Sequence, residues 1–239
     1  MSKETLSVCL TNFNREKLLY ESIEQVIDDE RISEIIISDD CSDYELYKRV
    51  VEYYKAWPKV KVSRNDTNVD CFRNKRKAVS LASNEFVILF DSDNILTKSY
   101  IDKLFHFEWD KHVIFQPVFA KPKFNFKEYS GLKITSKNVA RHIEFVTFGT
   151  MLNAMNYFVN RDEYLRVWNG DVDPVTSDSL YQNHQWLSHG NSIYVVPGLE
   201  YEHRVEDHGK EEKSHYVKNV KRTKSGFHQS IIDKLKKLK

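Results

Sequence analysis

Glycine and proline are scarce, because the 239 residues of this sequence include only 7 Gly and 5 Pro. This composition excludes collagen-like chains and low-complexity chains rich in these two residues. Long apolar runs are also missing, and the longest, at 35–37 and 86–90, are far too short to cross a bilayer. The polar start, Met1–Thr5, leads straight into a strand-like segment, so we expect no secretory signal peptide.

Cysteine is rare as well. Cys9, Cys41 and Cys71 are an odd number of thiols, and their spacing does not match a metal-binding motif. The simplest interpretation is reduced thiols in a cytoplasmic protein. Apolar and aromatic side chains, by contrast, make up 41% and 13% of the residues, which is enough to build a hydrophobic core.

The net charge of +1 conceals an uneven distribution along the chain. Residues 210–239 hold ten Lys/Arg and three Asp/Glu, a balance of +7, which leaves 26 basic and 32 acidic residues elsewhere, a balance of −6. An acidic body argues against a nucleic-acid-binding protein, whose basic surface should lie on the folded domain. The basic tail is interpreted first as a solvated, partly helical terminus. The alternative is peripheral contact with an anionic membrane or an acidic partner.

Strand-like and helix-like periods alternate through the first half of the sequence. Strands are predicted at 6–11, 34–38, 59–63 and 85–90, and helices at 15–29, 42–54, 72–83 and 99–107. Ser42 and Glu45 form a capping-box pattern at the start of the second helix. The short connections imply βαβ units, and therefore an α/β fold with a Rossmann-like, doubly wound, mostly parallel sheet flanked by helices.

The second half is less regular. Strands are predicted at 112–119, 157–160 and 193–196, and helices at 161–168 and 178–189, whereas 120–145 has no clear period and is expected to form loops. No internal repeat or flexible linker interrupts the chain, so a single domain is expected. Its parts are 1–110, 111–209 and the tail 210–239.

Polar clusters follow three of the predicted strands directly, at 12–14, 39–40 and 91–93. Ligands of doubly wound sheets bind at the carboxyl ends of the strands, so these clusters can meet in one crevice. The carboxylates of Asp91 and Asp93 suit Mg²⁺ or Mn²⁺ carrying a diphosphate. The alternative is a polar turn that caps the following helix.

Glycine-rich phosphate-binding motifs are absent from the sequence. Neither G-x-G-x-x-G nor G-x-x-x-x-G-K-[ST] occurs. We therefore expect a bound diphosphate to be neutralised by a cation and by basic side chains instead of a glycine-rich loop. The candidates for the basic side chains are Arg73, Lys75, Arg76 and Lys77.

Three segments together resemble a known family. They are LSVCLTNFNREKLLYESIEQV, EIIISDDCSD and NVDCFRNKRKAVSLASNEFVILFDSDN, in this order within about the first 110 residues. The pattern is similar to the nucleotide-binding half of family 2 glycosyltransferases, which have the GT-A fold and use nucleotide-diphospho-sugars. Two positions depart from it: Cys41 stands where the family usually has Gly, and Phe72–Arg76 replaces Ala-Arg-Asn-x-Gly. Which basic residue of 73–77 contacts the nucleotide stays open.

The resemblance implies roles for the matching positions on the donor side. Thr11 and Phe13 would line the base pocket, with the Phe13 ring packed on a uracil. Asp39 would accept the uracil N3–H, and Arg73 would contact the base or a phosphate.

The resemblance also implies a metal site. Asp91 would approach the ribose, and Asp93 would ligate Mn²⁺ or Mg²⁺. GLEYEHRVEDH is similar to the closing loop of the family, in which a histidine can complete the metal shell. His203 is the first candidate, and Arg204 and His208 are lesser ones.

A catalytic base is implied by TSDSLYQNHQWLSHG, which resembles the segment in which an acidic residue opens a helix and takes a proton from the acceptor. Asp178 occupies that position, and an ionised carboxylate is favoured at a helix N-terminus. The alternative is that Asp178 only caps the helix. Asp171 and Asp173 are then the fallback bases.

These residues predict an inverting glycosyltransferase that is dependent on Mn²⁺ or Mg²⁺. It would move a hexose or N-acetylhexosamine from a UDP-sugar to a hydroxyl of a glycan or lipid-linked acceptor, as in polysaccharide biosynthesis. The alternatives are a sugar nucleotidyltransferase and a non-catalytic nucleotide-sugar-binding protein. The expected location is the cytoplasm, with peripheral membrane contact through the tail as an option.

Overall fold

The computed structural model describes residues 5–204 and 226–238. Within them, nine strands form one sheet in the order β3-β2-β1-β4-β8-β5-β9-β7, and β6 pairs with β5. The strands are β1 (Leu6–Asn12), β2 (Ile32–Asp39), β3 (Val60–Arg64), β4 (Phe86–Asp91), β5 (Val113–Lys121), β6 (Phe124–Asn125), β7 (Lys133–Ile134), β8 (Tyr157–Asn160) and β9 (Ser192–Glu202).

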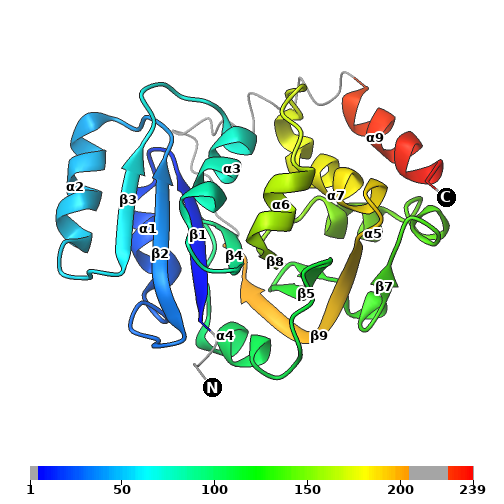
Figure 1. Cartoon of the computed structure of the whole chain (residues 1–239), viewed down its shortest axis with the longest axis horizontal. Coiled ribbons are helices and arrows are strands. Elements are labelled where there is room, and N and C mark those ends of the chain that lie inside the picture. The colour runs from blue at the N-terminus through cyan, green and yellow to red at the C-terminus, as the bar shows by residue number, and fades with distance from the viewer. Residues whose placement is uncertain (1–4, 205–225, 239) are drawn as a thin grey trace.

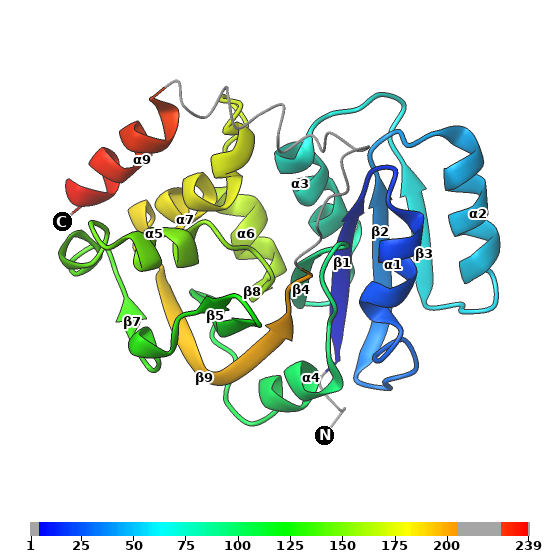
Figure 2. The same ribbon diagram turned by 180° about the vertical axis from the view of Figure 1, so that it is seen from behind.

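The helices lie on both sides of this sheet (Figures 1 and 2). They are α1 (Glu16–Ile23), α2 (Tyr44–Tyr54), α3 (Cys71–Leu81), α4 (Lys98–Leu104), α5 (Val146–Leu152), α6 (Arg161–Val167), α7 (Asp178–Ser188) and α9 (Phe227–Lys236), with short 3₁₀ turns η1 (Lys127–Tyr129), η2 (Val139–Arg141) and η3 (Val175–Ser177). The predicted α/β fold, a single large sheet flanked by helices, is confirmed.

Parallel pairing is concentrated in the first half of the chain. β3, β2, β1 and β4 are parallel neighbours, so their carboxyl ends share one edge of the sheet. β8 runs antiparallel to both β4 and β5, and β5 and β9 are again parallel. The second half is therefore mixed, because β8 enters the sheet from the opposite direction.

Alternation along the central strands supplies a core to each face of the sheet. On β1, Cys9 packs with α3 and the helices of the second half, whereas Val8 and Leu10 pack with α1, α2 and α4. β2 and β4 alternate in the same way. Strands buried on both faces contain nearly continuous apolar runs, which is why their positions were predictable.

The second half departs from the prediction in three places. Residues 120–145 are not only loops, because they contain β6, η1, β7 and η2. Helix α5 was not predicted at all. β9 does not end at Pro197–Gly198 but continues to Glu202, because a register shift opposite Pro117/Phe119 and a positive φ of 76° at Gly198 accommodate that pair as a bulge.

The predicted capping box at the start of α2 is wrong. The residue before the helix is Asp43, and no side chain caps the helix there. The Ser42 hydroxyl donates to the Asp39 carboxylate at 2.5 Å instead. Ser42 thus bonds Asp39 at the end of β2 and not, as the local pattern had predicted, the backbone of α2.

Glu34 is a buried carboxylate on β2, only 3% exposed, that joins three elements. It accepts bonds from Ser7 Oγ at 2.7 Å, Ser83 Oγ at 2.9 Å and Lys61 Nζ at 2.7 Å. Burial by itself would raise the pKa of Glu34, but these bonds and that of the Ser83 backbone N–H outweigh burial and lower the pKa to about 2 from 4.5.

Acid should therefore destabilise the protein through Glu34. A carboxylate with a lowered pKa stabilises the fold above its unfolded pKa of 4.5, and this contribution, about 3 kcal/mol, is lost as the pH falls through about 2. Urea unfolding at neutral pH and near pH 3 should show a smaller acid-induced loss of stability for Glu34→Gln than for the wild type. Equal losses in the two proteins would contradict this role.

The C-terminal helix α9 packs on α7 and η2 and lies at the side of the molecule away from β1–β3 (Figure 1). Ile231 and Leu235 are buried in this contact. His228 Nδ1 lies 2.8 Å from the hydroxyl of Ser177, the residue directly before α7. Most of the predicted basic tail, 210–225, and His208 lie outside the described residues. In the part of the chain that is described, every helix is too short or too polar to span a bilayer.

Candidate active site

The three polar clusters predicted from the sequence lie at one edge of the sheet. Asn12 pairs with Asp39 on one side of β1, and Thr11 pairs with Asp91 on the other. Adjacent strands are about 4.8 Å apart, so the ends of β2 and β4 are separated by roughly 10 Å. That distance is within the reach of one nucleotide. Thr11 and Phe13, both partly exposed, follow at the same strand end.

Asp39 is fully buried and organises this strand end. Its carboxylate accepts bonds from Asn12 Nδ2 at 2.9 Å and from the Ser42 N–H at 2.9 Å, in addition to the Ser42 hydroxyl. Arg64 Nε lies 3.8 Å away and adds positive charge. Because Asp39 is fully buried, the predicted contact with a uracil N3–H would require the groups that cover the carboxylate to move.

Cys41 adopts a left-handed backbone conformation, with φ at 63°. A position that needs a positive φ favours Gly, which accounts for the Gly that usually stands at this position. The chain retains the turn with a residue that pays a steric penalty of about 1–2 kcal/mol. The tight turn after β2 is therefore preserved although its usual residue is not.

The orientation of helix α3 determines which of the basic residues at 73–77 faces the site. Asp70 caps its N-terminus by accepting from the Arg73 N–H at 3.1 Å. This start places Asn74 and Lys75 on the buried face, where Asn74 bonds the Ser38 hydroxyl at 2.7 Å. Arg76 is exposed and lies over the Trp168 ring at 5.0 Å.

Arg73, the predicted nucleotide contact, is partly exposed and bonded to neighbouring groups. Its guanidinium pairs with Asp70 and also reaches the Gly170 carbonyl at 3.3 Å. Of the basic residues at 73–77, Lys75 is the one that meets the predicted site carboxylates among the described residues. Lys75 is thus the residue of this set that contacts the site carboxylates, and the identity of the residue that contacts the nucleotide stays a prediction.

Lys75 joins the two halves of the chain. Its ammonium lies 2.8 Å from Asp178 Oδ2 and 3.2 Å from Asp91 Oδ1, and its side chain is 5% exposed. Burial by itself would lower the pKa of Lys75, but Asp178 and Asp91 raise it well above its ordinary value. Burial raises the pKa of Asp91, and Lys75 opposes this. A charged lysine between two carboxylates therefore occupies the centre of the site.

Asp93 and His203 lie near each other because of a pairing between distant segments. Ile95 forms a bridge with Glu202, which brings the end of β9 beside the turn after β4. Asp93 is 31% exposed at its side chain and pairs with Arg15, a residue not singled out from the sequence. Burial lowers the pKa of His203, whereas the charges of Asp93 and Asp91 act in the opposite direction. His203 is thus neutral near pH 7, the form that binds metals.

Arg204, a lesser candidate, and Asp171, a fallback base, have other surroundings. Arg204 bonds the Leu18 carbonyl at 3.1 Å and pairs with Glu21 at 3.3 Å. Asp171 is exposed on the segment before α7. Among the described residues, no group of three or more His, Cys, Asp or Glu side chains is arranged to hold a metal ion.

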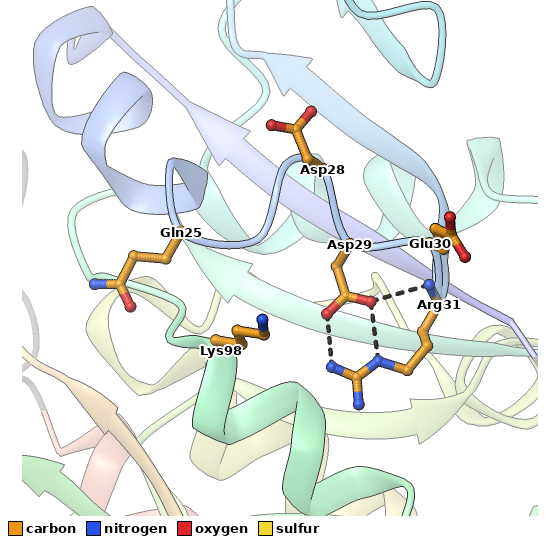
Figure 3. A pocket seen from close by; sticks show the side chains of 6 residues that line it. All are labelled: Gln25, Asp28, Asp29, Glu30, Arg31 and Lys98. Carbon is orange, nitrogen blue, oxygen red and sulfur yellow. Dashed lines mark hydrogen bonds and ion pairs between the residues drawn. The ribbon is translucent and has the colours of Figure 1, made fainter.

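A separate pocket lies near the opposite edge of the sheet, with a volume of about 430 Å³ (Figure 3). It is formed by the turn between α1 and β2 and by the start of α4, and Asp29 and Arg31 pair with each other in its wall at 2.6 Å. The predicted site residues are not part of its lining. We therefore assign the candidate active site to the carboxyl ends of the strands and not to this pocket.

The α/β fold, with its candidate site at the carboxyl ends of the strands, is consistent with the family that a comparison of the sequence identifies. Residues 7–168, more than half of the chain, match the family described as Glycosyl transferase family 2. The chain therefore belongs to this family of glycosyltransferases. No curated protein matches the chain at a significant level.

Crystal structures of S. aureus TarS have a similar fold. The complex of TarS 1-349 with UDP-GlcNAc has a TM-score of 0.64 and 17% identity, over 97% of this chain and 71% of that chain. TarS 1-349 alone has a TM-score of 0.62 and 19% identity, over 82% of this chain and 59% of that chain. The match thus spans 59% of the length of that structure. At these identities the likeness establishes the fold alone.

Proposed function

We propose that the chain transfers a hexose or N-acetylhexosamine from a UDP-sugar to a hydroxyl of a glycan or lipid-linked acceptor, with inversion at the anomeric carbon. The observation that carries this proposal is the placement of Asp91 and Asp178 on either side of one buried ammonium, at the ligand-binding edge of the sheet. Complexes of TarS with UDP-GlcNAc and with UDP support a uridine nucleotide as the donor carrier.

On the donor side, we assign the base pocket to the end of β1. Thr11 and Phe13 would line it, with the partly exposed Phe13 ring stacked on uracil. Asp39 would hold this strand end and accept the uracil N3–H after a local opening. Asp91 would approach the ribose, and Arg73, whose side chain is 40% exposed, would reach the base or a phosphate.

A divalent cation fits the donor set of this site. Mg²⁺ is usually bound by one or two carboxylates together with substrate phosphates, so a cluster of three protein ligands is not required. Asp93 and the neutral His203 would hold Mn²⁺ or Mg²⁺, and Arg15 would release Asp93 to do so. When bound, the cation would neutralise negative charge on the departing diphosphate.

On the acceptor side, Asp178 would act as the base. It removes the proton of an acceptor hydroxyl as that oxygen forms a bond to the anomeric carbon. The bond from this carbon to the diphosphate oxygen breaks on the opposite face, and its electron pair leaves with UDP. Asp178 is 8% exposed and opens α7, so its carboxylate is held by protein and favoured by the helix dipole.

A donor panel tests this proposal. Purified protein should release UDP from a UDP-hexose or UDP-N-acetylhexosamine in the presence of Mn²⁺ and an acceptor, and a metal chelator should abolish the release. A panel of GDP- and ADP-sugars is the matched control, because the Phe13 pocket is assigned to uracil and a purine is larger and differs in its hydrogen-bonding edge. UDP binding without turnover of any donor would identify a non-catalytic binding protein. Release of pyrophosphate from UTP and a sugar phosphate would identify a nucleotidyltransferase.

Location in the cytoplasm and peripheral membrane contact of the basic tail stay predictions. The described part of that tail, α9, turns Ile231 and Leu235 toward the protein, while Lys234 and Lys236 are exposed. Lys236 pairs with Glu144 at 2.9 Å, and the exposed Lys234 is compatible with an anionic surface.

A further inference from the structure

The two oxygens of the Asp178 carboxylate have different surroundings. Oδ2 accepts a bond from Lys75 Nζ at 2.8 Å, and the Cys71 thiol lies 3.5 Å from it. Among the described residues, Oδ1 receives only the Ser179 hydroxyl, at 3.5 Å. One oxygen is thus fixed by a charge, and the other is left almost without a partner.

Lys75 is itself held in place on several sides. Its side chain is 5% exposed, and α3 is fixed to the end of β2 through Asn74, which donates to the Ser38 carbonyl at 2.8 Å. Asp91, the second partner of Lys75, lies at the end of β4, where its N–H donates to Asn156 Oδ1 at 2.7 Å. The ammonium therefore has a defined position relative to both halves of the sheet.

The buried ammonium of Lys75 and the carboxylates of Asp91 and Asp178 compensate each other's charge. Asp91 and Asp178 carry two negative charges in a largely buried space, where like charges repel strongly. Removing the positive charge would leave both carboxylates uncompensated. Lys75 consequently controls where the Asp178 carboxylate can lie.

We infer that Lys75 is a positioning residue that fixes Asp178 through Oδ2 and leaves Oδ1 to take the proton of the acceptor hydroxyl. This inference rests on the proposed function, because it presumes that Asp178 acts as the base. Lys75 contacts Asp91 as well, so the same ammonium sets the distance between the donor side and the base. A misplaced base loses rate even when the substrates still bind.

The test compares Lys75→Met with the wild type. Methionine keeps most of the length of the side chain and removes its charge. We expect kcat for sugar transfer to fall by about 10²-fold, because orientation of the base is lost. The dissociation constant for UDP, measured by calorimetry, should change by less than about threefold. The matched control is Lys59→Met, which removes a partly buried lysine bonded to the Asp29 carbonyl at 2.8 Å and should leave kcat unchanged.

The double variant Lys75→Met/Asp178→Asn separates positioning from folding. It removes one charge of each sign, so it should be more stable than Lys75→Met alone. If Lys75 acts through Asp178, the double variant should be no slower than Asp178→Asn, since residues that act as a unit are not additive. This comparison also decides the matter if Lys75→Met does not fold.

Three results would overturn the inference while leaving the proposed function intact. They are a kcat of Lys75→Met within about threefold of the wild type, equal losses in kcat and in UDP affinity, and a further loss of about 10-fold or more in the double variant relative to Asp178→Asn. Failure of the proposed function is recognised separately, because the wild type itself would then transfer no sugar from any donor.

Discussion

Asp178→Asn is expected to lower kcat for sugar transfer by about 10²–10⁴-fold, the range that general-base catalysis typically contributes. Asparagine has nearly the same shape as aspartate, and its carbonyl oxygen can still accept the bond from Lys75, which lies 2.8 Å from Oδ2. It cannot, however, take a proton from the acceptor hydroxyl. The affinity for UDP, measured by calorimetry, should therefore stay within about threefold of the wild type.

The matched controls for this variant are Asp171→Asn and Asp173→Asn. Both residues are exposed on the segment before α7, whereas Asp178 is 8% exposed and contacts Lys75. We expect each control to retain kcat within about threefold, because a surface carboxylate that does not touch the reacting atoms contributes little. A large loss in either control, with Asp178→Asn nearly unaffected, would transfer the role of the base to that residue.

Asp93→Ala is expected to lower kcat/KM for the UDP-sugar by about 10²–10³-fold and to remove its dependence on Mn²⁺ concentration. The reason is that Asp93 is assigned, together with His203, to hold the cation, and its side chain is 31% exposed and so accessible to a metal ion. Removing a group that stabilises developing negative charge typically costs this much. A titration of activity with Mn²⁺ at saturating acceptor concentration measures the effect.

Asp28→Ala is the matched control for Asp93→Ala. Asp28 is an exposed carboxylate that lines the separate pocket near the other edge of the sheet (Figure 3). Its Mn²⁺ titration should follow that of the wild type. An unchanged Mn²⁺ response in Asp93→Ala would remove Asp93 from the metal site.

The central strands of the first half, β1, β2 and β4, were predictable because they are buried on both faces of a parallel sheet. A strand such as the predicted 34–38 can then be identified from its short apolar run alone. In the structure this strand is longer and spans Ile32–Asp39. Helix α5 had no such signal, because its seven residues are mostly small or apolar and make less than two full turns. The end of β9 depends on the bulge at Gly198, which pairing with β5 determines and local sequence does not.

The site was predictable only as far as strand ends could be identified. Clusters at the ends of β1, β2 and β4 meet because parallel neighbours share an edge. Which basic residue of α3 contacts the site carboxylates was not predictable, because each residue turns the helix by about 100° and a shift of one position in its start changes the buried face. The nearness of His203 to Asp93 follows from a bridge between residues 95 and 202, which are far apart in the sequence.

The position of β8 has a consequence for how the chain must be made. This strand, Tyr157–Asn160, lies between β4 and β5 although more than sixty residues separate it from the end of β4. A nascent chain that has just completed α4 already contains all four parallel strands, but one side of β4 still lacks its neighbour. Unpaired apolar strand edges associate readily with other chains. During synthesis we expect this side of β4 to stay unpaired until residue 160 has emerged, so the first half completes its sheet only with a strand from the second.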